Sequence, residues 1–586
     1  MKPEVFREFL REAYIEPVRS VLIVDDDYPT FDEILSQTKT EKRWREKPDD
    51  VLNVISQFRK NQPMMVDIHD GQNVDFGAEA KAISHLHQSD LLILDYELDR
   101  GQKDGSRAIS IVRNVLENNH FNLILVHTRE ELSQVFTSML LGVLSKQIVM
   151  LSPEDSEAAQ AQVEAAELDH ENIVAELLES MGLQQYLKFR EDPTGQLSID
   201  EGVFGQFLVV CEKAGWNDAD ARQIVAKWTL ERVHETYVEQ MNQNGPHELS
   251  WSAEQPFWIR CSSGFIAFTN KADGGGVNLI DQLLDGLCDW GPRPSRLFLV
   301  KLRAEMERAG VVAEDRALGT KHAHASWYSR LLAAEKAPRE FLLAETLSRS
   351  SEKLLAEVLP KISDFAARLI DSEETHDGVE PVIKSRFGID LADGGQARKA
   401  RNEHNVFVCS KEVEGYHLAP GHIFEADHQH WICLTPACDL VPGQKKVGRF
   451  SGIGEHLPFT AVRLHKVDQP DSTNPNSKPN KRYSKALNTG RYFIVNLGGN
   501  LQTFSINEPD DESSSPLWYS LFAADQGRFD KSSMKLKLFR TQEVENAGLT
   551  ASPLEGKIVA QLRYEYALNL MQKLGVSMTR IGLDFV

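Results

Sequence analysis

The sequence has few cysteines and no long apolar segment. Its six cysteines are spread over 586 residues without the spacing of a disulfide-stabilised secreted fold, which indicates a reducing compartment. No stretch approaches the ~20 consecutive apolar residues that a membrane-spanning helix requires. The first residues, MKPEVFREFLREAY, lack the apolar core of a secretory signal. We therefore expect a cytoplasmic protein without a membrane partner.

The chain has fewer basic than acidic residues. The chain carries 65 Lys and Arg against 87 Asp and Glu, a formal net charge of −22, so nucleic acid is not an expected partner. Three short basic stretches could contact phosphates, but they lack interleaved aromatic residues and are more typical of solvated loops. These stretches are Lys384-x-Arg386, Arg398-Lys399-x-Arg401 and Lys478-Pro-Asn-Lys481-Arg482.

The length of the chain predicts a multidomain protein. Apolar residues make up 41% and charged residues 26%, which is ordinary for a folded chain. The pattern predicts an N-terminal α/β doubly wound domain over residues 1–152 and a mainly α-helical domain over 153–375, with a β-hairpin near 256–271. Residues 376–586 are expected to form a β-rich α+β domain, a small barrel or sandwich closed by a terminal helix.

Polar residues follow three short apolar runs in the N-terminal region. The runs Val21–Val24, Leu91–Leu94 and Leu123–Val126 are apolar throughout, as expected of parallel strands that are buried on both faces. They are followed by Asp25-Asp26-Asp27, by Asp95 and by His127-Thr128. Because open α/β sheets bind ligands at the carboxyl ends of their strands, these side chains are predicted to form a site.

The later regions give weaker patterns. Ser152-Pro153-Glu154-Asp155 is typical of a helix N-terminus, and PFWIRCSSGFIAFTNK alternates like a hairpin. Predicted strands of the C-terminal domain are NVFVCS, HIFEA, HWICLTPA, FTAVRLHKV, RYFIVNL and LQTFSI. The segment EGKIVAQLRYEYALNLMQKLG has the apolar spacing of an amphipathic helix.

The block VLIVDDDYPTFDEIL, DLLILDYELDRGQKDGSRAI and LILVHTRE resembles the receiver domain of two-component response regulators over residues ~18–150. The resemblance implies a flavodoxin-like fold. It also implies that Asp95 is the phosphoacceptor and that Asp25 and Asp26 hold Mg²⁺ together with Asp95. Thr128 would hydrogen-bond the bound phosphoryl group, and Lys146 is the best-placed lysine to complete the site.

The same resemblance implies a response regulator of a phosphorelay. A partner histidine kinase or ATPase sensor protein would phosphorylate Asp95, and the added charge would switch contacts of the central and C-terminal regions with a downstream protein target. Self-phosphorylation would be the sole catalysis, so the protein is not expected to be primarily an enzyme. The segments TPACDL, QLRYEYA and TRIGLDF resemble large bacterial receiver-containing proteins of stress or phage defence. A homodimer is a further candidate assembly.

Three alternatives stay open. The receiver could be a pseudo-receiver scaffold without phosphoryl transfer, or it could regulate a hydrolase or nuclease site in the C-terminal domain. Four side chains of types that bind zinc also lie within eleven residues, but their spacing matches no common zinc motif, and half-buried thiols are the other interpretation. These four residues are His428, His430, Cys433 and Cys438.

Overall fold

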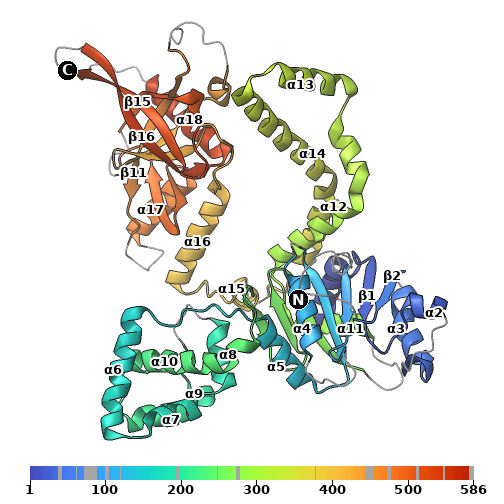
Figure 1. Cartoon of the computed structure of the whole chain (residues 1–586). Helices are drawn as coiled ribbons and strands as arrows, with labels where there is room; N and C mark the ends of the chain where they lie inside the picture. The colour runs from blue at the N-terminus through green and yellow to red at the C-terminus, as the bar shows by residue number, and fades with distance from the viewer. Residues whose placement is uncertain are drawn as a thin grey trace. The chain divides into compact units, whose positions relative to one another are not determined.

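The computed structural model describes most of the chain. The described residues are 1–36, 43–60, 63–71, 89–98, 105–118, 120–192, 197–246, 248–271, 278–376, 378–443, 453–470, 477–509, 514–544 and 548–579. They divide into two compact units, Met1–Ala304 and Glu305–Val586. Figure 1 labels the elements along the chain. Among the described helices, none combines the length and apolar composition needed to cross a membrane.

The N-terminal unit contains a seven-stranded sheet in the order β2-β1-β3-β4-β7-β6-β5. The first five strands in this order are parallel to their neighbours, whereas β6 and β5 continue the sheet in antiparallel pairing. The strands are β1 Ser20–Val24, β2 Met65–His69, β3 Leu91–Leu94, β4 Asn122–Thr128, β5 Ser250–Ser252, β6 Trp258–Cys261 and β7 Gly264–Asn270. The predicted parallel α/β sheet is therefore present, and its apolar runs are central strands because both of their faces are covered.

Helices pack on both faces of this sheet. Leu22, Leu94 and Val126 share a hydrophobic core with α4 and α5, whereas Phe265 of β7 lies against Gly286 of α11 on the opposite side. The helices of this unit are α1 Pro3–Leu10, η1 Arg11–Ile15, α2 Phe31–Ser36, η2 Arg43–Arg45, α3 Pro48–Lys60, α4 Ser106–Leu116, α5 Leu132–Val143, α6 Pro153–Asp169, α7 Ile173–Ser180, α8 Leu183–Glu191, α9 Glu201–Lys213, α10 Ala219–Tyr237, η4 Val238–Gln240 and α11 Leu279–Trp290.

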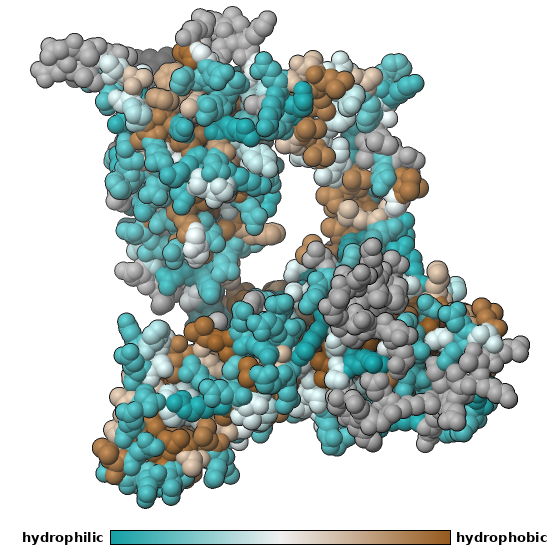
Figure 2. Space-filling view, viewed as in Figure 1, coloured by the Kyte–Doolittle hydropathy of each residue, from teal (hydrophilic) through white to brown (hydrophobic). Residues whose placement is uncertain are grey.

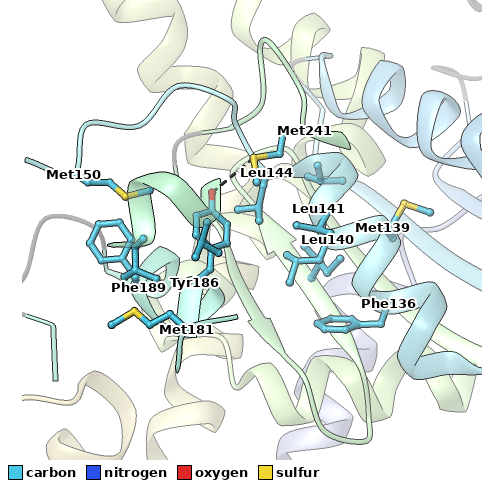
Figure 3. Close-up of a cluster of buried hydrophobic side chains, with 14 of the residues drawn as sticks. Phe136, Met139, Leu140, Leu141, Leu144, Met150, Met181, Tyr186, Phe189 and Met241 are labelled. Carbon is cyan, nitrogen blue, oxygen red and sulfur yellow. Dashed lines mark hydrogen bonds between the residues drawn. The ribbon is translucent and has the colours of Figure 1, made fainter. Parts of the chain in front are cut away.

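The helical segment α6 to α10 lies in the chain between α5 and β5. Its predicted start is confirmed, because the Ser152 hydroxyl accepts the N–H of Asp155 and Pro153 takes the first helical position. The buried residues of this segment join one hydrophobic core with those of α4, α5 and the sheet. Figure 3 shows Leu140 and Leu144 on one side of this core and the rings of α8 on the other. The helical segment is thus part of the same folded unit as the sheet.

A buried polar network reinforces this junction. Arg190, which is 8% exposed, donates to the hydroxyl of Tyr186 at 2.8 Å and to the backbone oxygen of Ser145 at 3.0 Å. The Tyr186 hydroxyl also lies 2.8 Å from Nδ1 of His234. Ser145 follows α5, so these bonds tie α8 and α10 directly to the end of α5.

The C-terminal unit contains a closed β-barrel. Strands β10, β9, β16, β15, β14 and β11 pair in this order, and β10 also pairs with β11, which closes the ring. β13 and β12 extend the sheet beyond β11. The strands are β8 Ser410–Lys411, β9 His422–Ala426, β10 Gln429–Cys433, β11 Leu457–Val467, β12 Tyr492–Leu497, β13 Asn500–Ser505, β14 Trp518–Ala523, β15 Lys535–Val544 and β16 Gly548–Leu562.

Successive residues of the barrel strands belong to different cores, as the alternation of side chains along a strand requires. Phe424 and Trp431 belong to the cluster to which all six barrel strands contribute, whereas Ile423 and Ile432 belong to the cluster that contains Leu570 of α18. The remaining elements are α12 Pro294–Leu318, which crosses the boundary between the units, α13 Lys321–Ala333, α14 Lys336–Asp371, α15 Glu380–Phe387, α16 Gly394–Cys409, η5 Ala437–Leu440, α17 Lys478–Asn488, η7 Asp525–Gly527 and α18 Tyr564–Met578.

Three predicted elements are placed differently from the sequence-based expectation. The segment EGKIVAQLRYEYALNLMQKLG was predicted as one amphipathic helix, but residues 555–562 form the end of β16 and α18 begins at Tyr564. The hairpin near 256–271 forms as β6 and β7, but β7 pairs in parallel with β4 and so extends the N-terminal sheet. The predicted strand NVFVCS is instead the end of α16, a helix that begins where the Asp393 side chain accepts the N–H of Gln396. Its β-branched composition is overridden by the helix that precedes it and by packing on the barrel domain.

Candidate functional site

The predicted site residues meet at one edge of the N-terminal sheet. Val24 of β1 is in register with Leu94 of β3, and Leu94 is in register with Val126 of β4. Asp25 and Asp95 each follow one of these strands, and Thr128 ends β4. The parallel register therefore brings the carboxyl ends of three strands together, as the sequence pattern indicated.

Asp25, Asp26 and Asp95 form a compact acidic cluster. One carboxylate oxygen from each lies within 4.8 Å of those of the other two. Asp25 and Asp95 are only 2% and 7% exposed, and Asp26 is half-buried. The Asp25 carboxylate is oriented by the backbone, because its Oδ1 accepts the N–H of Asp27 at 3.0 Å.

A lysine from a distant part of the sequence completes this cluster. Lys271 directly follows β7, and its Nζ lies 2.8 Å from Oδ2 of Asp25 and 2.5 Å from Oδ2 of Asp95. Its backbone N–H donates to the oxygen of Thr128 at 2.7 Å. The ring of Tyr28 lies beside the same ammonium group, with its centroid 6.0 Å from Nζ.

The buried charges perturb one another strongly. Burial, together with the negative charges of Asp25 and Asp26, raises the pKa of Asp95 to about 7 despite the opposing effect of Lys271. For Lys271, burial acts to lower the pKa, but attraction to Asp25 and Asp95 outweighs it, so the pKa is raised and the ammonium stays charged. Burial and the nearby Lys271 lower the pKa of His127 to about 3, which keeps this imidazole neutral.

The donor set fits a hard divalent cation. Three carboxylates, two of them almost fully buried, bring oxygen ligands together beside the ammonium group of Lys271. Carboxylate oxygens are the ligands that Mg²⁺ prefers, and Mg²⁺ sites in proteins commonly use one or two carboxylates with water and phosphate oxygens. Asp25, Asp26 and Asp95 are thus the residues that would hold Mg²⁺.

Two neighbouring residues shape this edge of the sheet. Thr128 is fully buried, and its Oγ1 accepts the N–H of Glu130 at 3.2 Å in the turn that leads to α5. Gly105, which precedes α4, has φ +58°, and a Cβ on it would lie 2.0 Å from the ring of Tyr96, the residue after Asp95. Glycine is therefore required at position 105, where the backbone before α4 passes close to the ring of Tyr96.

Lys146 is not the lysine at this cluster. Its Nζ lies 3.8 Å from Oε2 of Glu239, and its backbone N–H donates to Asn242 at the end of the helical segment. Sequence reasoning missed Lys271 because a hairpin pattern suggested a separate domain. The sequence does contain an indication of this strand. Gly264–Asn270 is a further buried apolar run that ends in polar residues, like the three runs that precede the other site residues.

The four candidate zinc ligands are not brought together. In the part of the chain that the structure describes, Asp25, Asp26 and Asp95 form the single group of three or more such side chains with metal-ligand spacing. Cys433 is fully buried in the barrel core, where burial raises the pKa of its thiol to about 12. Cys438 is exposed beside Asp439, and the ring of His430 packs on Phe504. His428 occupies the β9–β10 turn with φ +57°.

Comparison with known proteins agrees with the N-terminal geometry. Residues 17–174 match the family model described as the response receiver domain. No curated protein and no solved structure matches the chain. The match runs from β1 through α6 and ends at the start of α7, so the family model does not reach β7, the strand that precedes Lys271. A response-regulator-type role in signal transduction follows from this receiver domain.

Proposed function

We propose that the N-terminal unit is a phosphorylation-competent receiver with Asp95 as its phosphoacceptor. The observation that carries this proposal is the convergence of Asp25, Asp26 and Asp95 with Lys271 at the carboxyl edge of the sheet. Phosphoryl transfer depends mainly on positioning and on neutralisation of charge, and this cluster supplies carboxylates for a cation and a fixed ammonium group. The partner proposed to supply the phosphoryl group is a phosphodonor kinase.

The proposed reaction balances as a simple transfer. An Asp95 carboxylate oxygen attacks the phosphorus atom of the donor, a new O–P bond forms, and the bond from phosphorus to the donor's imidazole nitrogen or acetate oxygen breaks. Bound Mg²⁺ would neutralise charge on the phosphoryl oxygens. Asp25 and Asp26 would hold that cation, and Lys271, which now bonds Asp95, would transfer its hydrogen bond to a phosphoryl oxygen.

We propose that phosphorylation affects the helical segment through the ends of the two strands that flank it in sequence, β4 and β7. Thr128 precedes α5, Lys271 follows β7, and the two residues are joined by a backbone hydrogen bond. The intervening α6 to α10 share a core with α5, and Arg190 bonds to Ser145 directly after it. A change in charge at Asp95 is therefore expected to alter the packing of this segment and its contacts with a downstream protein.

Phosphoryl uptake tests the proposal. The purified chain should incorporate label from radiolabelled acetyl phosphate in the presence of Mg²⁺, and Asp95→Asn should not. Asp90→Asn is a matched control, because Asp90 caps the start of β1 through the backbone N–H groups of Arg19 and Ser20, away from the cluster. Equal labelling of the Asp95→Asn variant would contradict the assignment.

A beryllofluoride titration separates this proposal from a pseudo-receiver scaffold. A competent site binds Mg²⁺ and the phosphoryl mimic together, and the binding should disappear in Asp95→Asn. A folded chain that binds neither would be a scaffold that keeps the receiver fold without its chemistry.

A further inference from the structure

Aromatic rings and arginines gather at the edge of the N-terminal sheet that is opposite to the acidic cluster. Phe121 directly precedes β4, and Phe265 is the second residue of β7. The helix α11 runs antiparallel to β7, because Gln282 near its start contacts Thr269, whereas Trp290 at its end stacks on Phe265. The end of α11 therefore lies at the edge where the parallel strands begin, and the proposed phosphorylation site lies where they end.

Two arginines lie against the ring of Trp290 at this edge. The guanidinium carbons of Arg260 in β6 and Arg296 in α12 are each 5.6 Å from the ring centroid. The guanidinium carbon of Arg296 is also 5.0 Å from the ring centroid of Phe121. Trp290 in turn stacks on Phe265 and Phe121, with ring centroids 5.4 and 6.4 Å away. The packed rings and the cation–π attraction thus hold both guanidinium groups in place.

The first turns of α12 add a third arginine and an apolar side chain. Arg296, Leu299 and Arg303 have the i, i+3, i+7 spacing of one helical face, and all belong to the N-terminal unit. Arg303 is exposed, and Leu299 is 66% exposed. On the side of the molecule drawn in Figure 2, hydrophilic residues predominate and hydrophobic residues form small groups between them. An exposed leucine between two arginines can supply an apolar contact inside a basic surface.

The charges of these arginines are not neutralised within the described parts of the chain. Arg260, Arg296 and Arg303 form no ion pair there with a carboxylate. The buried Nε atoms of Arg260 and Arg296 have no hydrogen-bond partner, so neither guanidinium is fully satisfied. Burial and the charge of Arg296 lower the pKa of Arg260, and the attraction of Glu248 does not offset them. In a chain with a net charge of −22, such a surface is unexpected.

The chemistry of this surface favours a short acidic peptide over a nucleic acid. Guanidinium groups held in fixed positions recognise carboxylates through parallel N–H groups. Trp290 already stacks on two rings and Phe265 is fully buried, so these rings offer little free surface to a nucleobase. The net charge of the chain opposes a long polyanion, whereas a short segment meets mainly the local charge, because salt screens the rest beyond about 8 Å.

We propose that this basic edge, formed by Arg260, Arg296, Leu299 and Arg303, docks an acidic peptide segment of a partner protein. Carboxylates of the segment bind the arginines, and an apolar side chain of the segment contacts Leu299. The inference goes beyond the proposed phosphorylation and is independent of it, since none of these residues belongs to the cluster around Asp95.

Fluorescence anisotropy of the full chain with a fluorescein-labelled peptide of glutamate and leucine tests the proposal. The peptide should bind with a micromolar Kd, the affinity should fall as salt is added, and the same peptide with glutamine for glutamate should not bind. The double variant Arg260→Gln/Arg303→Gln should weaken binding by ~10-fold or more, as expected for two lost charge-assisted contacts. Arg232→Gln should leave the Kd unchanged. It is a matched control, because Arg232 also lies on a tryptophan ring of this unit, 3.2 Å from the centroid of Trp228.

Charge reversal at the exposed arginine keeps the proposal testable if the double variant does not fold. Arg303→Glu should weaken binding of the glutamate peptide by ~10-fold or more, because it replaces an attraction by a repulsion. The same variant should strengthen binding of a peptide of lysine and leucine. Replacement of the leucines of the glutamate peptide by alanine should weaken its binding, because the contact with Leu299 is lost.

Several results would overturn the proposal. These are no binding of the glutamate peptide up to about 1 mM, or equal effects of Arg303→Glu and Arg232→Gln on its Kd. Undiminished binding of the alanine-substituted peptide would contradict the contact with Leu299. A single-stranded oligouridylate that binds at least ~10-fold more tightly than the peptide would assign the basic edge to nucleic acid instead.

Discussion

The backbone N–H of Lys271 donates to the oxygen of Thr128 at 2.7 Å, while the ammonium group of the same lysine lies 2.8 Å from Asp25. The chain between Thr128 and Lys271 contains α5, the whole helical segment, β5 and β6. Lys271 thus links the acidic cluster to β4, the strand that precedes this long segment. A change in the charge that Lys271 faces is therefore expected to affect both ends of this segment.

Lys271→Ala should abolish most of the phosphoryl uptake, because the ammonium that faces Asp25 and Asp95 is lost. A decrease on the order of 10²-fold is expected, as for the removal of one preorganised donor from a reacting site. Lys146→Ala is the matched control, since Lys146 pairs with Glu239 instead, and it should label like the parent chain. Labelling that depends on Lys146 and not on Lys271 would contradict the geometry.

Asp26→Asn should weaken Mg²⁺ binding by ~10-fold or more, because it removes one anionic ligand from a cluster of three. Asp27→Asn is the comparison, since Asp27 is adjacent in sequence but does not belong to the cluster. The Mg²⁺ dissociation constants can be measured by calorimetry on the full chain. Equal effects of the two substitutions would indicate a general loss of negative charge and no specific ligand.

Gly105→Ala should destabilise the N-terminal unit by ~1–3 kcal/mol, because alanine is strained at φ +58° and its Cβ would overlap the Tyr96 ring. Gly205→Ala is a useful control in the same unit. Gly205 lies inside α9 with no atom within 4 Å of an added Cβ, so this change should stabilise the helix by up to about 1 kcal/mol. Urea unfolding followed by far-ultraviolet circular dichroism distinguishes the two directions.

Tyr186→Phe should destabilise the junction between the helical segment and α5 by ~1–3 kcal/mol, since buried Arg190 and His234 both lose a hydrogen-bond partner. Tyr237→Phe makes the same chemical change in a ring 6.2 Å away. No hydrogen bond of the Tyr237 hydroxyl is found among the described residues, so this variant should unfold like the parent. A similar loss in both variants would show that the network does not stabilise the junction.

His422 should make the C-terminal unit less stable in mild acid. Burial lowers the pKa of this histidine to about 4, below its ordinary value near 6.5, and its Nδ1 already accepts the N–H of Ala419. Between these two values the unfolded chain binds a proton that the folded chain does not, so the free energy of unfolding decreases as the pH falls from 6.5 to 4. The full decrease from this residue is about 3 kcal/mol.

The pH dependence can be assigned to His422 by comparison with His422→Gln. Urea unfolding at pH 7 and pH 5 gives a difference for each chain, and the difference should be smaller in the variant. If both chains lose the same stability over this interval, other groups account for the acid sensitivity.

The local sequence determined three strands of the parallel sheet, β1, β3 and β4, and three of the four charged groups at its edge. A short apolar run that ends in carboxylates specifies both burial and the point at which the chain emerges, so Asp25, Asp26 and Asp95 could be predicted to meet. The start of α6 at Ser152 follows from its capping residues, and the β-rich character of the C-terminal domain follows from alternation, which both act over a few neighbouring residues. The sequence left a barrel and a sandwich open, and the pairing of β10 with β11 decided for the barrel.

The tertiary structure alone decided the place of β7 and therefore the role of Lys271. Apolar alternation shows that a segment is a strand, but it does not specify which strand becomes its neighbour when a helical segment of this length intervenes. Pairing of β7 with β4 depends on the core that α5 shares with α6 to α10, and this core forms from residues far apart in sequence. Likewise, the stretch Lys478-Pro-Asn-Lys481-Arg482 was predicted to be a solvated loop, but it forms the first turns of α17, which Ser477 caps.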